Sequence, residues 1–151
     1  MMEKNRKITP PVYLMLILAL MWLMNYCFPL YQYTHPPVAY SGIIFVFFGI
    51  AMAAISTEMF KAAETGLEPF DEVTTLITGG FYRYTRNPQY LGMFLMLFGV
   101  AILLGSVGSL LPVPAFVLVI RNNFVLGEER FMEASFGRHY LDYKSAVRRW
   151  F

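Results

Sequence analysis

The sequence predicts an all-α, polytopic helical membrane protein with about four transmembrane helices and a cytoplasmic C-terminal helical segment. Two observations favour this fold class. Hydrophobic residues make up 57% of the 151 residues and the mean hydropathy is +0.49, values that a soluble domain of this size rarely reaches. Charged residues, 15% of the chain, are absent from two long stretches, residues 8–57 and 87–120.

These two uncharged stretches set the number of predicted spans within a single domain, residues 1–151. The first is 50 residues long, enough for two spans of about 20 residues and a turn, and we place these spans at about 11–30 and 38–56. The second is only 34 residues long, so we expect a short or tilted pair of spans at about 88–104 and 110–126. A three-span arrangement, with one helix of this second pair re-entrant, is the alternative.

The basic residues predict how the spans are oriented. All twelve Lys and Arg lie at the N-terminus, between the second and third spans, or in the tail from Arg121 onward. The two expected outer turns, near residues 31–38 and 105–109, contain none. Because basic segments of membrane proteins favour the cytoplasmic side, we expect both termini in the cytoplasm. We expect the protein to lie in a lipid bilayer, and this bilayer is the inner membrane if the cell is bacterial.

Composition also limits the partners and cofactors. The net charge is only +2, with ten acidic residues among the basic ones, so the charge pattern does not indicate a nucleic-acid partner. One cysteine, Cys27, and two distant histidines make neither a disulfide nor a metal site. We expect Cys27 to be a small buried apolar residue. The oligomeric state stays open.

Individual residues in the first half of the chain indicate where helices begin and where one helix packs closely against another. Pro10 suits a helix start. Small residues of the second span, Gly42 and Gly49 among them, allow another helix to approach closely. Charged residues follow at helical spacing from Glu58 onward, so we expect this helix to continue beyond the membrane to about residue 65, before a linker without a catalytic pattern.

A polar segment, residues 79–92 (GGFYRYTRNPQYLG), separates the second and third predicted spans. Polar side chains at a membrane boundary are costly unless they are used or paired. Pro88 disfavours helical backbone angles at Asn87 and suits the first turn of the next helix. Arg86 and Asn87 should therefore lie at a helix N-terminus, where unpaired N–H groups and the helix dipole favour an anionic group.

A second polar segment, residues 127–151 (GEERFMEASFGRHYLDYKSAVRRWF), follows the last predicted span. Its pattern predicts a helix broken near Gly137 and a second helix that carries Tyr140 and Tyr143. We expect this segment and residues 79–92 to close over a cofactor at a membrane face. A membrane-surface helix is the alternative, and Trp150 beside two arginines fits it.

The two segments resemble the signatures of the isoprenylcysteine carboxyl methyltransferase family and of the related phospholipid methyltransferases. The first signature stands here as Gly80-Phe81-Tyr82 and Arg86-Asn87-Pro88-Gln89-Tyr90-Leu91-Gly92, and the second as Glu128-Glu129, Phe136-Gly137, Tyr140 and Tyr143. The resemblance implies a small helical membrane enzyme that uses S-adenosyl-L-methionine. Asn87 stands where the family usually has a histidine, and asparagine cannot titrate, so a base that relatives could have there is missing.

On this resemblance we expect Arg86 and Glu129 to be catalytic, with no metal. The residues expected to bind S-adenosyl-L-methionine are Tyr82, Arg86, Asn87, Pro88, Tyr90, Gly92, Glu128 and Glu129. Arg86 would bind a carboxylate of the cofactor or of an acidic substrate, and a glutamate would bind the ammonium or the ribose hydroxyls, or orient Arg86. Neighbouring helical residues point about 100° apart, so only one of the two glutamates should face the site. Tyr82 and Tyr90 would line the adenine or the sulfonium.

The function we favour is methyl transfer from S-adenosyl-L-methionine to a lipophilic acceptor at the membrane, a carboxyl group of the isoprenylcysteine type, because a carboxylate needs no strong base. A phospholipid amine or a small thiol is the alternative acceptor. Two other functions stay open. A nicotinamide-dependent membrane reductase would need more spans, and a non-enzymatic membrane scaffold would leave Arg86, Asn87 and the glutamate pair unexplained.

Overall fold

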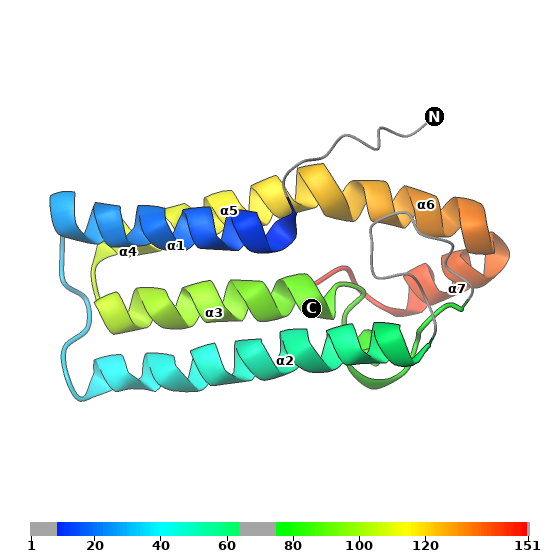
Figure 1. Ribbon diagram of the computed structural model, residues 1–151, viewed down its shortest axis with the longest axis horizontal. Coiled ribbons are helices and arrows are strands. Elements are labelled where there is room, and N and C mark those ends of the chain that lie inside the picture. The colour runs from blue at the N-terminus through cyan, green and yellow to red at the C-terminus, as the bar shows by residue number, and fades with distance from the viewer. Residues whose placement is uncertain (1–8, 64–74, 151) are drawn as a thin grey trace.

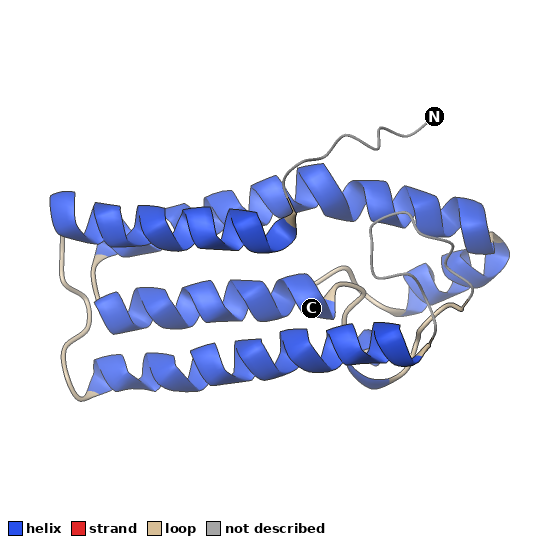
Figure 2. Ribbon diagram, in the orientation of Figure 1, coloured by secondary structure: helices blue, strands red, loops and turns tan. Residues whose placement is uncertain are grey.

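The computed structural model describes residues 9–63 and 75–150, and Figure 2 shows that the regular elements in these ranges are helices. The longer α-helices are α1 (Pro10–Cys27), α2 (Gly42–Ala62), α3 (Pro88–Leu104), α5 (Pro112–Ile120), α6 (Leu126–Phe136) and α7 (Arg138–Ala146). The shorter elements are α4 (Val107–Leu110), the 3-10 helices η1 (Val38–Ser41) and η2 (Gly80–Arg83), and the π-helical turn η3 (Arg121–Val125). The predicted all-α fold class is confirmed.

Among the described residues, three helical stretches are long and apolar enough to cross a membrane: Pro10–Cys27, Val38–Ala62 and Val107–Phe136. Their mean hydropathies are 1.5, 2.3 and 1.6. α3 is also apolar but has only 17 residues, which give a length of about 25 Å against a hydrocarbon core of about 30 Å. All four predicted helices are therefore present, whereas the count of four complete spans remains a prediction.

α3 lies at the centre of the bundle. It packs against α2 on one side and against α1 and α5 on the other (Figure 1). Large, fully buried side chains fill the space where α1, α3 and α5 meet, among them Met21, Leu97, Phe116 and Ile120. Because α3 is central, its N-terminal residues, among them Pro88 and Tyr90, are buried by other parts of the chain.

The segments that connect the membrane helices lie at the two ends of the bundle. The start of α1, the end of α2, the turn before α3, and α6 with α7 lie at one end, on the right in Figure 1. Residues 28–41 and the turn at 105–106 lie at the other end and contain no Lys or Arg. This separation agrees with the arrangement expected from the basic residues, and the assignment of one end to the cytoplasm stays a prediction.

The last predicted span is part of a longer helix. α4, α5, η3 and α6 follow one another in a single helical stretch of 30 residues, Val107–Phe136, and the end of the span near residue 126 stays a prediction. Gly127 stands at the expected boundary, and one glycine costs a helix only about 1 kcal/mol, which is too little to end it. The glutamate pair at 128–129 consequently stands on a direct extension of the membrane helix.

Three smaller predictions have different outcomes. The break near Gly137 is confirmed, since its φ of +52° favours glycine and α7 begins at the next residue. α2 ends at Ala62, and the rest of its expected extension falls in residues 64–74, outside the described part of the chain. The prediction that Cys27 is buried is wrong, because Cys27 is exposed at the end of α1.

The outer faces of α1 and α2 are apolar. Only 11% of the α1 span and 22% of the α2 span are buried within the protein. Large exposed side chains cover both helices, including Leu16 and Trp22 on α1 and Phe47 on α2. A contiguous apolar surface of this kind is unfavourable in water and suits a hydrocarbon environment.

α2 and α3 pack through glycines that face one another. Gly42 lies against Gly99, and Gly49 lies against Gly92. A Cβ atom added at Gly49 would lie 2.5 Å from the carbonyl oxygen of Gly92, so the two backbones are in direct contact. The close helix approach predicted from Gly42 and Gly49 is confirmed, and it matches the way small residues bring membrane helices together.

Replacement of Gly49 by alanine tests this contact. Alanine normally stabilises a helix interior by about 1 kcal/mol relative to glycine. Here the added Cβ would meet the α3 backbone, so we expect a loss of about 1–3 kcal/mol and a lower Tm in detergent, measured by circular dichroism. Gly79→Ala is the control, because nothing lies within 4 Å of a Cβ added there and its φ is −90°. An equal Tm for the two variants would contradict the packing role of Gly49.

Candidate active site

The turn before α3 is built as the sequence predicts. Gly80 has a φ of +56°, which favours glycine, and the chain passes from there through η2. Asn87 has non-helical angles, φ −129° and ψ 56°, and Pro88 is the fully buried first residue of α3. Arg86 and Asn87 therefore lie at the N-terminus of α3.

The C-terminal residues bind to this turn, and Figure 1 shows the chain after α7 returning to the start of α3. The backbone N–H of Arg86 donates to the carbonyl oxygen of Arg148 over 3.0 Å. The carbonyl oxygen of Arg149 accepts two further hydrogen bonds, from the Thr85 hydroxyl at 3.0 Å and from the Asn87 side-chain amide at 3.1 Å. These three bonds fix the backbone of the tail against the first polar segment.

Glu129 joins the two polar segments electrostatically. One of its carboxylate oxygens lies 3.2 Å from Nη1 of Arg86. The carboxylate also accepts two hydrogen bonds from Arg149, through Nε and Nη2, each 2.8 Å long. The side chains of Glu129 and Arg86 are only 7% and 9% exposed. One buried carboxylate thus faces two guanidinium groups, and each charge needs the others because an unpaired buried charge is costly.

Two donor atoms of Arg86 have no hydrogen-bond partner among the described residues. These atoms are Nε and Nη1, both buried, although Nη1 lies at ion-pair distance from Glu129. Buried donors in folded proteins are nearly always hydrogen-bonded, so such atoms mark a place where another group can bind. A guanidinium presents its donors in the planar arrangement that matches a carboxylate.

Glu128 also contacts the first polar segment. Its Oε1 accepts a hydrogen bond of 2.6 Å from the hydroxyl of Tyr90, in the first turn of α3. We expected only one of the two neighbouring glutamates to face the site, whereas in the structure both contact the first polar segment. The side chains diverge as expected, but Tyr90 is long enough to reach Glu128 while Glu129 turns toward Arg86.

The tyrosines of the second segment cover the turn. The hydroxyl of Tyr143 donates to the carbonyl oxygen of Tyr82 over 2.7 Å, and the rings of Tyr140 and Tyr143 lie 6.1 Å apart. Burial raises the pKa of Tyr82, and it raises the pKa of Tyr143 to about 12. Burial also raises the pKa of Tyr140, an effect that Glu129 reinforces and Arg86 opposes. These phenols are therefore neutral hydrogen-bond donors near neutral pH.

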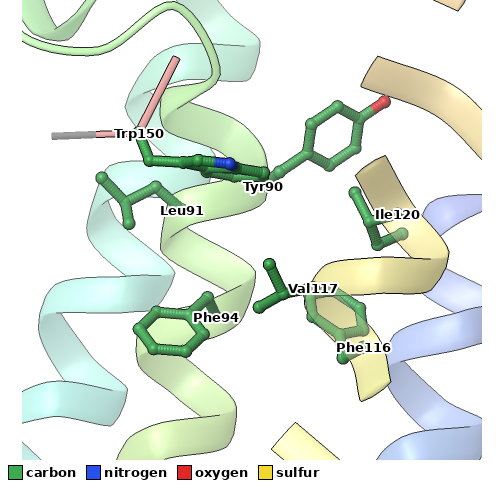
Figure 3. Close-up of a pocket in the computed structure, with 7 residues that line it drawn as sticks. All are labelled: Tyr90, Leu91, Phe94, Phe116, Val117, Ile120 and Trp150. Carbon is green, nitrogen blue, oxygen red and sulfur yellow. The ribbon is translucent and has the colours of Figure 1, made fainter. Parts of the chain in front are cut away.

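Two cavities adjoin the polar cluster. The first, of about 210 Å³, lies between α3 and α5 (Figure 3) and is lined by Tyr90, Leu91, Phe94, Phe116, Val117, Ile120 and Trp150. The second, of about 430 Å³, adjoins the turn before α3 and is lined by Met52, Phe81, Tyr84, Thr85, Leu91 and Trp150. Tyr90 connects the first cavity to the polar cluster, because its ring lines the cavity while its hydroxyl binds Glu128.

The predicted site residues gather at one end of α3, with one residue placed differently. Gly92 faces α2, where an added Cβ would lie 2.7 Å from the carbonyl oxygen of Gly49, so its contact in the structure is helix packing.

The described residues contain no group of three His, Cys, Asp or Glu side chains that could hold a metal ion.

Sequence reasoning missed Thr85 and Arg149. Arg149 was interpreted with Trp150 as part of a membrane-surface pattern, and no spacing rule connects it to Glu129, 20 residues earlier in the chain. Its neighbour Trp150 was the sequence signal that could have indicated this contact. A large aromatic residue next to two arginines also suits a tail that packs onto a polar site.

A family model described as Phospholipid methyltransferase matches residues 37–139, about two thirds of the chain. The chain belongs to this family. The matched range runs from η1 to the start of α7 and includes both the turn before α3 and the glutamate pair. Arg149 and Trp150 lie beyond it.

Two relatives of this phospholipid methyltransferase family member are similar to part of the chain. The protein-S-isoprenylcysteine O-methyltransferase of Schizosaccharomyces pombe is 36% identical over 75 residues, which are 48% of this chain and 30% of that protein. An uncharacterized protein of Haemophilus influenzae is 39% identical over 62 residues, 41% of this chain and 98% of that protein. The match thus spans less than a third of the yeast relative's length. No solved structure matches the chain.

Glu129→Gln removes the negative charge between Arg86 and Arg149 without changing the size of the side chain. We expect the free energy of unfolding to fall by about 3 kcal/mol, because the buried guanidinium of Arg86 and the partly exposed guanidinium of Arg149 lose their counter-charge. Glu58→Gln is the matched control, since Glu58 forms an exposed pair with Lys61 that contributes less than about 1 kcal/mol. Denaturant titration in micelles measures both, and equal losses would show that the cluster is not a buried ion network.

Proposed function

We propose that the chain is an S-adenosyl-L-methionine-dependent methyltransferase that acts at the membrane on a lipophilic acceptor. One observation supports this most directly. Arg86 from the first segment and Glu129 from the second form a buried ion pair at the end of a helix bundle, beside a cavity between two helices. Membership of the phospholipid methyltransferase family and the name of the yeast relative favour the same chemistry.

The polar cluster suits the charges of S-adenosyl-L-methionine. One of the unbonded donors of Arg86, Nε or Nη1, can donate to its carboxylate, and the adjacent glutamates can accept from its ammonium group. The second cavity, of about 430 Å³, adjoins the same turn through Thr85, the residue before Arg86, and its mostly apolar lining suits the adenine ring better than the charged groups. When bound, the cofactor supplies a methyl group on a sulfonium.

The protein groups in this proposal mainly position the reactants. Displacement at a sulfonium methyl needs the acceptor and the donor in line and needs charge held in place. Arg86 binds the anion, and Glu129 fixes the orientation of Arg86 through their ion pair. Asn87 and Pro88 hold the turn, while Tyr82 and Tyr90 contribute aromatic walls that attract a cation.

The cavity between α3 and α5 suits the hydrocarbon part of the acceptor. Its lining is apolar, and it lies between helices whose outer surfaces suit lipid, so a lipid-soluble molecule can reach it from the membrane. At the polar end, the hydroxyl of Tyr90 and the carboxylate of Glu128 adjoin the cavity. The reacting head group of an acceptor bound in this way would lie near the charged cluster.

A carboxyl acceptor of the isoprenylcysteine type fits these residues better than an amine. An amine must lose a proton during methylation, whereas a carboxylate attacks without a base. Asn87, at the position of the family histidine, cannot titrate, and its side-chain amide binds the carbonyl oxygen of Arg149. The excess of guanidinium over carboxylate around Glu129 also favours an acidic acceptor.

Binding measurements test the cofactor assignment. Calorimetry on the detergent-purified protein should detect S-adenosyl-L-methionine and its demethylated product, with NADPH as the negative control. Arg86→Ala should weaken this binding by about 10- to 100-fold, as expected for lost charge-assisted hydrogen bonds. Arg83→Ala is the matched control, because Arg83 is exposed in the same turn. Unchanged affinity in Arg86→Ala would refute the assigned role, and NADPH binding in place of the methionine pair would favour a reductase.

The chemistry of the product identifies the acceptor. With a radiolabelled methyl donor and N-acetyl-S-farnesylcysteine, we expect a methyl ester that releases labelled methanol in base. Transfer to phosphatidylethanolamine would give a base-stable N-methyl group instead. Base-labile product should be formed by the unmodified protein and fall at least about 100-fold in Arg86→Ala, which loses an interaction with the reactants. Label found only in base-stable product would exclude the carboxyl acceptor.

A further inference from the structure

The guanidinium of Arg149 binds both oxygens of the Glu129 carboxylate. Its Nε donates to Oε1 and its Nη2 donates to Oε2, each over 2.8 Å. Two parallel bonds of this kind add geometric specificity as well as energy, so they fix the plane of the carboxylate. Arg86 meets the same carboxylate differently, because its Nη1 lies 3.2 Å from Oε1 without a hydrogen bond. Arg149, rather than Arg86, therefore sets the orientation of Glu129.

The main chain of Arg149 is fixed beside Arg86. Its carbonyl oxygen accepts hydrogen bonds from Thr85 and Asn87, the residues on either side of Arg86 in the sequence. The side chain of Arg149 is 28% exposed, whereas that of Glu129 is 7% exposed. One residue of the tail thus holds the turn through its carbonyl oxygen and the buried carboxylate through its guanidinium.

Without Arg149, the carboxylate of Glu129 would bind Arg86 instead. The side chain of Arg86 is only 9% exposed, and its Nε and Nη1 have no hydrogen-bond partner in the part of the chain that the structure describes. Buried donors take a partner wherever one is within reach. Oε1 already lies 3.2 Å from Nη1, so a small rotation of a released carboxylate would turn this contact into a hydrogen bond. That bond would use a donor that the ligand needs.

We propose that Arg149 is a positioning residue, which holds Glu129 so that Arg86 keeps an unbonded donor for the carboxylate of the methyl donor. This inference rests on the proposed function and names the residue that maintains its anion site. Arg149 acts through Glu129 and need not touch the ligand. Two guanidinium groups around one carboxylate also leave one positive charge in excess, which a ligand carboxylate balances.

Two ligands that differ by one carboxylate test this role. Calorimetry on the detergent-purified protein compares S-adenosyl-L-homocysteine, the demethylated product, with its decarboxylated analogue. In Arg149→Ala the preference for the carboxylated ligand should fall about tenfold, while the affinity for the analogue changes by less than about twofold. Arg138→Ala is the matched control, because it removes one positive charge from a side chain that is 88% exposed. Equal weakening of both ligands by Arg149→Ala would indicate a merely structural role and overturn the inference.

Arg149→Lys separates the bidentate contact from the charge. Lysine keeps the positive charge but lacks the planar pair of donors, so the preference for the carboxylated ligand should still fall by about threefold or more. An unchanged preference would show that charge alone matters and would overturn the role of Arg149.

The double variant Arg149→Ala with Glu129→Gln tests the capture of Arg86 directly. A neutral glutamine attracts a guanidinium more weakly than a carboxylate does, so Arg86 should be released. The preference for the carboxylated ligand should therefore be higher in the double variant than in Arg149→Ala. A lower preference would contradict capture by Glu129. Where the double variant does not fold, Arg149→Lys decides.

A spectrum of the ligand-free protein decides the inference whether or not a methionine cofactor binds. Arginine side-chain N–H groups give ¹⁵N NMR signals in micelles, and Arg86→Lys identifies those of Arg86. In Arg149→Ala a bond to Glu129 should slow rotation of the Arg86 NH₂ group and give a resolved signal at lower field, whereas Arg138→Ala should not. Unchanged Arg86 signals in Arg149→Ala would overturn the inference. If neither ligand binds the unmodified protein, the proposed cofactor fails, and this spectrum still shows whether Arg149 restrains Glu129.

Discussion

The buried carboxylate of Glu129 is the interaction on which the polar end of the molecule depends. It stands on the extension of the last long helix and contacts Arg86 at the start of α3 and Arg149 in the tail. In a medium of low dielectric neither of the buried charges, on Glu129 and Arg86, is tolerated alone, and the two hydrogen bonds from Arg149 join the tail to this pair. The position of Trp150 follows from this, because it is the next residue after Arg149.

The two sides of α3 are packed in different ways, and this difference decides where an opening can exist. Toward α2 the contact along most of α3 is between backbones, through the glycine pairs, and space opens at the start of α3, where Met52 and Leu91 line the second cavity. Toward α1 and α5 the contact is made by large side chains such as Leu97 and Phe116, which fill most of the space but not the part near Tyr90. A fixed α2–α3 pair beside a more loosely filled α3–α5 contact suits a site that admits molecules from the side.

The sequence predicted the helical class, the glycine contacts and the meeting of the two polar segments, because each depends on local chemistry or on strong periodic patterns. Asn87-Pro88 is an example, since proline restricts its neighbour in any fold. Burial was predicted less well. Cys27 is exposed although it is apolar in character, because lipid and protein core favour the same side chains and hydrophobicity alone does not separate them. Arg149 was missed because its partner is brought near only by the turn at Gly137, whose direction no sequence pattern specifies.

The π-helical turn at residues 121–125 has a consequence for the whole arrangement. A π turn holds one more residue than an α turn, so it shifts the phase of every side chain that follows without ending the helix. One residue corresponds to about 100° of rotation. The carboxylates of Glu128 and Glu129 reach the start of α3 only because the side chains after η3 are rotated in this way. The extra residue in η3 therefore rotates the polar part of the helix relative to its membrane part. The membrane part faces α1, and the polar part faces the start of α3.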